Sequence, residues 1–225
     1  FERANQLSGR WDYDGDYKAA GIGTMTIEGG HFLILDSEQA TFDHFVIKAG
    51  EIRASLESKD SAPLVSDTFD YQGGQLVISA AEQTEPEGVY TVIKSESQSE
   101  MNQLAANSEL LYDGDEKSGS FSGLGEANGI QDSAIYDVYL QQGSLQLVVD
   151  KKSAPEVIAD LDCSDPDQYV EAICEPGSPG KDIVDKILDD ILNEIDLPII
   201  SEQTLAKLFI SGLAPRNIDG PGRGM

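Results

Sequence analysis

The sequence is poor in the residues on which most catalytic and metal-binding motifs depend. Its 225 residues include two cysteines, two histidines and one tryptophan. It contains no HExxH, Walker or GxSxG pattern, and His31 and His44 do not form a ligand cluster. Cys163 and Cys174 lack the CxxC spacing and have no further cysteines beside them, which argues against a thiolate zinc site. These shortages favour a non-enzymatic protein, with no catalytic residue and no organic cofactor.

Positive charge and long apolar runs are also scarce. Lysine and arginine number 15 against 41 acidic residues, which gives a net charge of −26. Such a surface repels phosphates, so we expect no nucleic-acid partner, and it favours cations and basic protein surfaces. A general acidic surface selected by a saline habitat explains the same charge. No apolar run approaches the ~20 residues of a membrane helix, so the sequence predicts no transmembrane segment.

The two cysteines indicate an oxidising compartment. An isolated pair close in sequence is typical of a local disulfide, so we expect Cys163 to bond to Cys174. Two reduced, buried thiols are the alternative. The sequence begins at Phe1 rather than at methionine, which either removal of an export signal or trimming of the chain would produce. We therefore expect an extracytoplasmic protein, located in the periplasm, at the cell surface or in the medium.

Four segments share one pattern, in which two apolar or alternating runs flank a short turn that contains glycine. They are residues 24–36, 44–56, 68–80 and 136–150. Each has the signals of a β-hairpin. Together with shorter runs, they predict a mainly β fold, with an antiparallel barrel or sandwich of about ten strands in residues 1–152.

The composition changes in residues 153–225. An acidic, proline-punctuated segment that holds both cysteines comes first. Residues 181–197 then carry a wide apolar stripe at helical spacing, and Ser201 caps a second helix over residues 202–211. We expect a C-terminal helical hairpin packed on the β-domain, followed by a Gly/Pro-rich tail. Binding of the stripe in a partner's groove is the alternative.

Acidic turns are the best candidates for a ligand site. Asp12, Asp14 and Asp16 alternate as oxygen ligands do in calcium loops, and Asp113 and Asp115 repeat that spacing. Tyr17 and Gly23 stand where an EF-hand loop needs its glycine and its glutamate, so the first cluster is not that motif. Calcium at Asp12, Asp14 and Asp16 is the metal site that the sequence predicts. Chance clustering among 41 acidic residues is the alternative.

Three functional classes fit these features. The leading one is an exported, non-enzymatic binding or assembly protein that works with a protein partner or with copies of itself. The second follows from Gly9-Arg10-Trp11, which resembles the Gly-x-Trp of the first strand in lipocalin-like domains and implies a carrier of a small apolar ligand. Trp11 plugging one end of the β-core explains the same residues. The third is a hydrolase with a carboxylate pair, which requires two acids across a cleft.

Overall fold

The computed structural model describes residues 3–6, 10–13, 22–34, 40–55, 64–80, 86–114, 116–131, 133–141, 145–160, 164 and 198–213. The strands are β1 (Arg3–Gln6), β2 (Arg10–Tyr13), β3 (Ile22–Ile34), β4 (Ala40–Ser55), β5 (Leu64–Tyr71), β6 (Gln75–Ser79), β7 (Gly88–Lys94), β8 (Ser108–Tyr112), β9 (Lys117–Ser120), β10 (Tyr136–Gln141) and β11 (Leu145–Lys151). The helices are α1 (Gln98–Ala105), α2 (Ala154–Asp160) and α5 (Glu202–Leu213), and η1 (Glu126–Asn128) is a 3₁₀ turn. The fold is therefore mainly β, as the sequence predicts.

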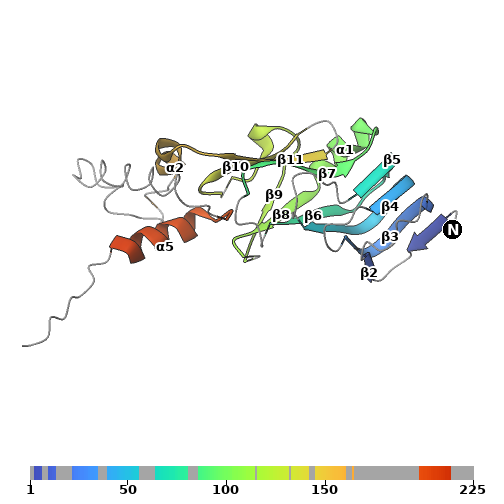
Figure 1. Ribbon diagram of the computed structural model, residues 1–225, viewed down its shortest axis with the longest axis horizontal. Coiled ribbons are helices and arrows are strands. Elements are labelled where there is room, and N and C mark those ends of the chain that lie inside the picture. Colours follow the sequence, from blue (N-terminus) through green and yellow to red (C-terminus); the bar gives the residue numbers. More distant parts are fainter. Residues whose placement is uncertain are drawn as a thin grey trace, which may run out of the picture.

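The N-terminal strands form a stack of four chain passes, which we call rungs. The first rung is β1 with β2, the second is β3, the third is β4 and the fourth is β5 with β6. Each rung pairs in parallel with the next, so that equivalent residues lie side by side. Phe45, for example, lies between Met25 and Phe69. Figure 1 shows β3, β4 and β5 next to one another at the end of the molecule that carries the N-terminus.

Three of the four expected hairpins are wrong. A hairpin over residues 44–56 would pair its two arms with each other. Instead, Ile47 pairs with Ile27 of the preceding rung and with Tyr71 of the following rung. Residues 24–36 and 68–80 behave in the same way. Residues 136–150 do form the expected hairpin, in which β10 and β11 are antiparallel and Tyr136 lies opposite Lys151.

Glycine residues allow the rungs to turn their corners in close contact. Gly30, Gly50 and Gly74 all have positive φ angles, of 76°, 90° and 98°. A Cβ on Gly50 would lie 2.5 Å from the carbonyl oxygen of Gly30, and one on Gly74 would lie 2.8 Å from that of Gly50. The same glycine-containing turn that suggests a hairpin thus serves as a stacked corner.

Beyond β4 the sheet divides into two branches. The first half of β4 pairs with β5, and its second half pairs with β6. One branch continues from β5 through β7 and β11 to β10, and the other continues from β6 through β8 to β9. The strands β9, β10 and β11 join by antiparallel pairing. The result is a mixed, largely parallel sheet curled into a half-barrel (Figure 1) rather than an antiparallel barrel or sandwich.

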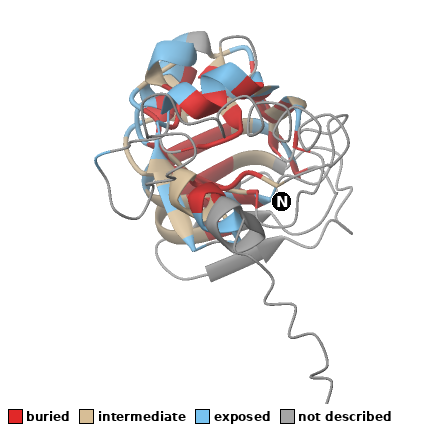
Figure 2. Cartoon of the chain, turned by 90° about the vertical axis from the view of Figure 1, so that its left-hand side faces the viewer, coloured by how far each residue is buried: buried red, intermediate tan, exposed pale blue. Residues whose placement is uncertain are grey.

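The buried apolar side chains of the described residues form one continuous core, and Figure 2 shows in red the strand and helix segments that contribute them. Four phenylalanines gather near the third rung. The rings of Phe45 and Phe69 stack at 5.6 Å, and Phe32 and Phe42 pack against Phe45 at centroid distances of 5.6 and 5.3 Å. Phe32, Phe42, Phe45 and Phe69 are each at most 2% exposed. Ring contacts between neighbouring rungs therefore reinforce the backbone pairing.

Two helices complete the core at the end opposite the first rung (Figure 1). Before α2, the backbone N–H and the hydroxyl of Ser153 both donate hydrogen bonds to Glu156 Oε2, which holds the start of the helix. The second predicted C-terminal helix is α5, and the Oγ of Ser201 accepts a hydrogen bond from the backbone N–H of Thr204. Leu205 is buried in the core.

Two further features of the C-terminal region concern the expected first helix and the exposure of α5. The first helix of the expected hairpin, over residues 181–197, lies outside the described residues. Leu208, which helical spacing would place beside Leu205, is 52% exposed. Within the described part of the chain, no helix has the length and apolar character needed to cross a membrane.

The corner glycines supply a direct test of the stacked rungs. Replacement Gly50→Ala adds a Cβ against neighbouring backbone at φ +90°, whereas Gly125→Ala adds one at φ +91° with no atom within 4 Å. Both should lose ~1–2 kcal/mol from the positive φ, and Gly50→Ala should lose clearly more because backbone must shift. Urea unfolding measures both free energies. Equal losses in the two variants would contradict a backbone contact at the corner.

Candidate functional site

The stacked corners form the floor of a polar surface groove of about 660 Å³, which we call the corner groove. Gly30, Gly50 and Gly74 contribute backbone without side chains. His31, Glu51 and Gln75 follow them in three successive rungs and line the groove. Since neighbouring strands are ~4.8 Å apart, the groove presents one hydrogen-bonding side chain per rung.

Contacts between rungs fix these side chains. The Nδ1 of His31 lies 2.8 Å from Glu51 Oε2, and Arg53 donates to the same oxygen from Nε and Nη2, each at 2.8 Å. Gln75 of the fourth rung donates from Nε2 to Oε2 of Glu109 in the neighbouring strand β8 at 2.7 Å. The groove wall is therefore a ladder of cross-strand polar pairs.

Glu51 is the shared acceptor of this ladder. Burial raises the pKa of its carboxyl, but hydrogen bonds and charge from Arg53 and His31 outweigh burial and hold the pKa below its usual value. The pKa of Glu51 is lower in the folded protein than in the unfolded chain. The ionised carboxylate therefore stabilises the fold at pH values above the unfolded pKa. This contribution is lost as the pH falls through the folded pKa.

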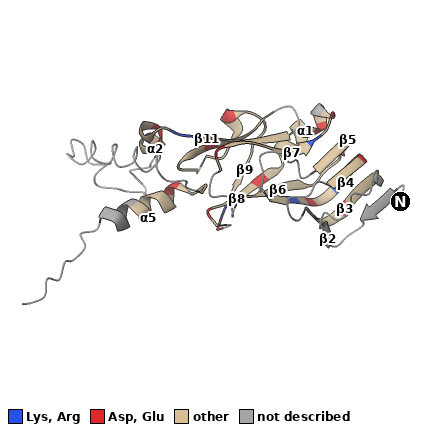
Figure 3. Cartoon of the chain, viewed as in Figure 1, with Lys and Arg blue, Asp and Glu red and all other residues tan. Residues whose placement is uncertain are grey.

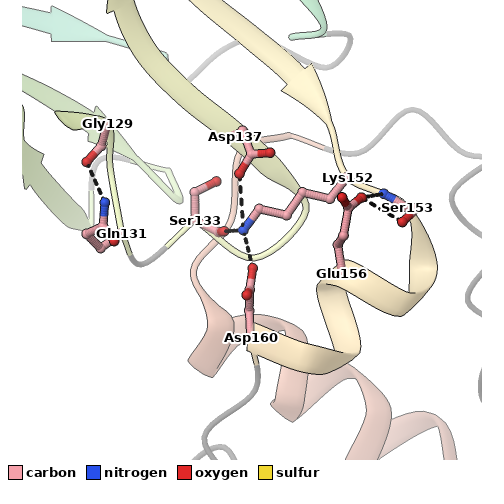
Figure 4. A network of polar contacts seen from close by, with 8 residues as sticks. All are labelled: Gly129, Gln131, Ser133, Asp137, Lys152, Ser153, Glu156 and Asp160. Atoms are coloured by element: carbon pink, nitrogen blue, oxygen red, sulfur yellow. Dashed lines mark hydrogen bonds and ion pairs between the residues drawn. The ribbon is translucent and has the colours of Figure 1, made fainter. Parts of the chain in front are cut away.

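A second polar pocket, of about 600 Å³, lies between β10, η1 and the ends of α2 and α5. Basic residues are few on the described strands (Figure 3), and Lys152, which directly follows β11, lines this pocket. Its Nζ donates to the carbonyl oxygen of Ser133 at 2.8 Å and to Asp160 Oδ2 at 2.7 Å, and it lies 3.7 Å from Asp137 Oδ1 (Figure 4). We call these four residues the lysine junction.

The lysine junction joins three parts of the chain. Lys152 directly follows β11, Asp137 is in β10 and Asp160 ends α2. The side chain of Lys152 is 7% exposed, whereas those of Asp137 and Asp160 are 45% and 44% exposed. The two carboxylates thus remain hydrated while they neutralise a buried ammonium, which is the arrangement of a structural ion pair rather than of a free nucleophile.

The side chains of the predicted metal ligands and of the two cysteines lie outside the described residues. Asp12 lies on β2 beside Leu33, and its side chain, together with Asp14 and Asp16, falls outside the described residues. Cys163 and Cys174 also fall outside them, so the disulfide stays a prediction. In the part of the chain that the structure describes, no three His, Cys, Asp or Glu side chains are grouped as a metal site would need.

Asp113, from the other acidic turn, has a structural role instead. With φ +56°, it accepts hydrogen bonds from the hydroxyls of Ser201, at 2.9 Å, and Thr204, at 2.6 Å. Its carboxylate therefore anchors the start of α5. Sequence reasoning also did not single out Glu51 or Lys152. The regular spacing of Gly30, Gly50 and Gly74 was the available signal for the groove.

The pKa of the Glu156 carboxyl is lowered, because the side chain and the backbone of Ser153 donate hydrogen bonds to it. No protein-family model, no curated protein and no solved structure matches this chain.

The lysine junction predicts a specific loss of stability. Lys152→Met removes the ammonium and leaves the Ser133 carbonyl without that donor. We expect a loss of ~2 kcal/mol, within the ~1.5–3 kcal/mol range of hydrogen bonds to charged groups. Lys94→Met, at an exposed lysine of β7, should change stability by less than ~0.5 kcal/mol. Urea unfolding of both variants makes the comparison, and equal effects would show that the junction is not stabilising.

Proposed function

We propose that this protein is an exported, non-enzymatic binding or assembly protein of the cell surface or periplasm. The observation that carries this proposal is the filled interior of the half-barrel. The large side chains of the core, including Tyr90, Tyr112 and the four phenylalanines, are nearly fully buried. The two pockets described above lie at the surface and are lined largely by polar residues. Recognition on such a molecule takes place on its exterior.

Two further features support an exported protein. The net charge of −26 favours solubility and attraction to basic surfaces. The expected disulfide between Cys163 and Cys174 belongs to an oxidising compartment. We retain calcium at Asp12, Asp14 and Asp16 and the C-terminal helical hairpin as parts of this proposal. In a binding protein, both would stabilise the scaffold rather than perform chemistry.

The two alternative functions make different demands on the fold. A carrier of a small apolar ligand needs an apolar cavity that the ligand can enter. A carboxylate-dependent hydrolase needs two acids across a cleft, one of them with a raised pKa. The phenylalanine cluster occupies the space near the third rung, and Glu51 in the corner groove is held ionised. Neither alternative gains support from the described residues.

A fluorescent apolar probe distinguishes surface recognition from carriage. N-phenyl-1-naphthylamine titrated into the native full chain should give no saturable rise in emission, because phenylalanine and tyrosine side chains occupy the core of the described part of the chain. A lipocalin-type carrier serves as the positive control for the assay. Saturable binding of one probe per chain would contradict the proposal and favour the carrier. Hydrolysis of a chromogenic glycoside would likewise contradict it and favour the hydrolase.

A further inference from the structure

The corner groove crosses five neighbouring strands. Its lining residues come from β3, β4, β6, β8 and β9 or from the turns that join them, and this is their order in the sheet. Glu51 pairs with His31 on one side and with Gln75 on the other. The backbone N–H of Leu76 donates to the Asn107 carbonyl at 3.2 Å, so Asn107 continues the row beyond Gln75. Four intervals of ~4.8 Å between strands give the groove a length of ~19 Å.

The polar side chains of this row each keep a hydrogen-bonding atom that the protein does not use. Glu51 receives both of its partners on Oε2, and His31 makes its contact through Nδ1. Gln75 and Asn107 each donate from the amide nitrogen. Within the described residues, Glu51 Oε1, His31 Nε2, the two amide oxygens and the hydroxyl of Ser120 have no side-chain partner. A ligand in the groove therefore meets a line of atoms that are mostly acceptors.

The groove is close to neutral in a chain with a net charge of −26. Among its described lining residues, those that can carry charge are His31 and Glu51, and Arg53 bonds to the Glu51 carboxylate. The second polar pocket, by contrast, contains four carboxylates and one ammonium. A cationic ligand is attracted more strongly to that pocket than to the groove. The groove instead suits an uncharged ligand that can donate several hydrogen bonds, as hydroxyl groups do.

The dimensions of the groove favour an extended ligand. A volume of about 660 Å³ spread along five strands accommodates one chain rather than a compact molecule. The strand spacing of ~4.8 Å is close to the length of one pyranose unit in a β-1,4-linked chain, so successive sugar units can meet successive rungs. The glycines of the floor carry no side chains, which allows sugar rings to approach the backbone.

We propose that the corner groove binds a neutral, extended oligosaccharide of β-1,4-linked hexose units. This inference rests on the proposed binding function and names its ligand. Sugar hydroxyls donate to the amide oxygens of Gln75 and Asn107 and to Glu51, and they accept from the hydroxyl of Ser120. None of the described lining residues is aromatic, so hydrogen bonds carry the affinity and a Kd of ~0.1–1 mM is expected.

Nuclear magnetic resonance titration of the isotope-labelled full chain tests the proposal. Cellotetraose or tetra-N-acetylchitotetraose should shift the amide signals of His31, Gln75 and Asn107 saturably. Maltotetraose, whose α-linked glucose units form a curved chain, should bind at least about tenfold more weakly. Gln75→Ala should weaken binding by about tenfold, because it removes an acceptor from the middle of the row. Gln146→Ala is the matched control, since Gln146 is also a cross-strand amide but lies on β11 outside the groove.

Several outcomes would overturn the proposal. They are no saturable shift with either β-linked tetramer up to ~10 mM, shifts away from the groove, and equal weakening by Gln75→Ala and Gln146→Ala. If Gln75→Ala unfolds, Asn107→Ala at an exposed position replaces it. Binding of a cationic glucosamine tetramer alone would also overturn it and assign the effect to charge. Failure with both neutral tetramers, together with exclusion of the apolar probe, would leave the proposed function in place with a protein partner.

Discussion

Parallel backbone hydrogen bonding between successive rungs is the interaction on which the rest of the described structure depends. It brings Met25, Phe45 and Phe69 into one row, and thereby assembles the phenylalanine cluster. It also brings the corner glycines together, which requires residues without a Cβ and produces the corner groove. In a stack of this kind, each rung is stabilised by its neighbours, so the loss of one interface weakens those on either side.

The positions of strands followed from the sequence more readily than their partners. Residues 44–56 and 136–150 are expected to hold strands, and the first lie almost wholly in β4 while the second form β10 and β11. A glycine-containing turn between apolar runs looks the same in a hairpin and at a stacked corner, because alternation records which face is buried and not which strand lies alongside. Gly30, Gly50 and Gly74 recur at intervals of 20 and 24 residues, and such recurrence of one pattern can indicate stacking of repeated units.

In the candidate sites, too, the sequence predicts the position of a residue more readily than the residues it contacts. His31 and Glu51 are 20 residues apart in the chain, and Lys152 lies 15 residues from Asp137, so their contacts follow from tertiary pairing rather than from any local motif. Asp113, in a turn whose sequence resembles a cation site, anchors the start of α5 through hydrogen bonds that its sequence position does not predict. The buried core and the two polar surface pockets are the features on which the proposed recognition through the exterior rests.

Nuclear Overhauser effects between backbone protons test the rung stack most directly. Parallel stacking predicts contacts from Phe45 to both Met25 and Phe69, and from Ile52 to Phe32 and Leu76. A hairpin over residues 44–56 would instead give contacts between its own two arms, such as Ile47 with Ile52. Observation of the first set without the second would establish the parallel register, and observation of the second set would contradict it.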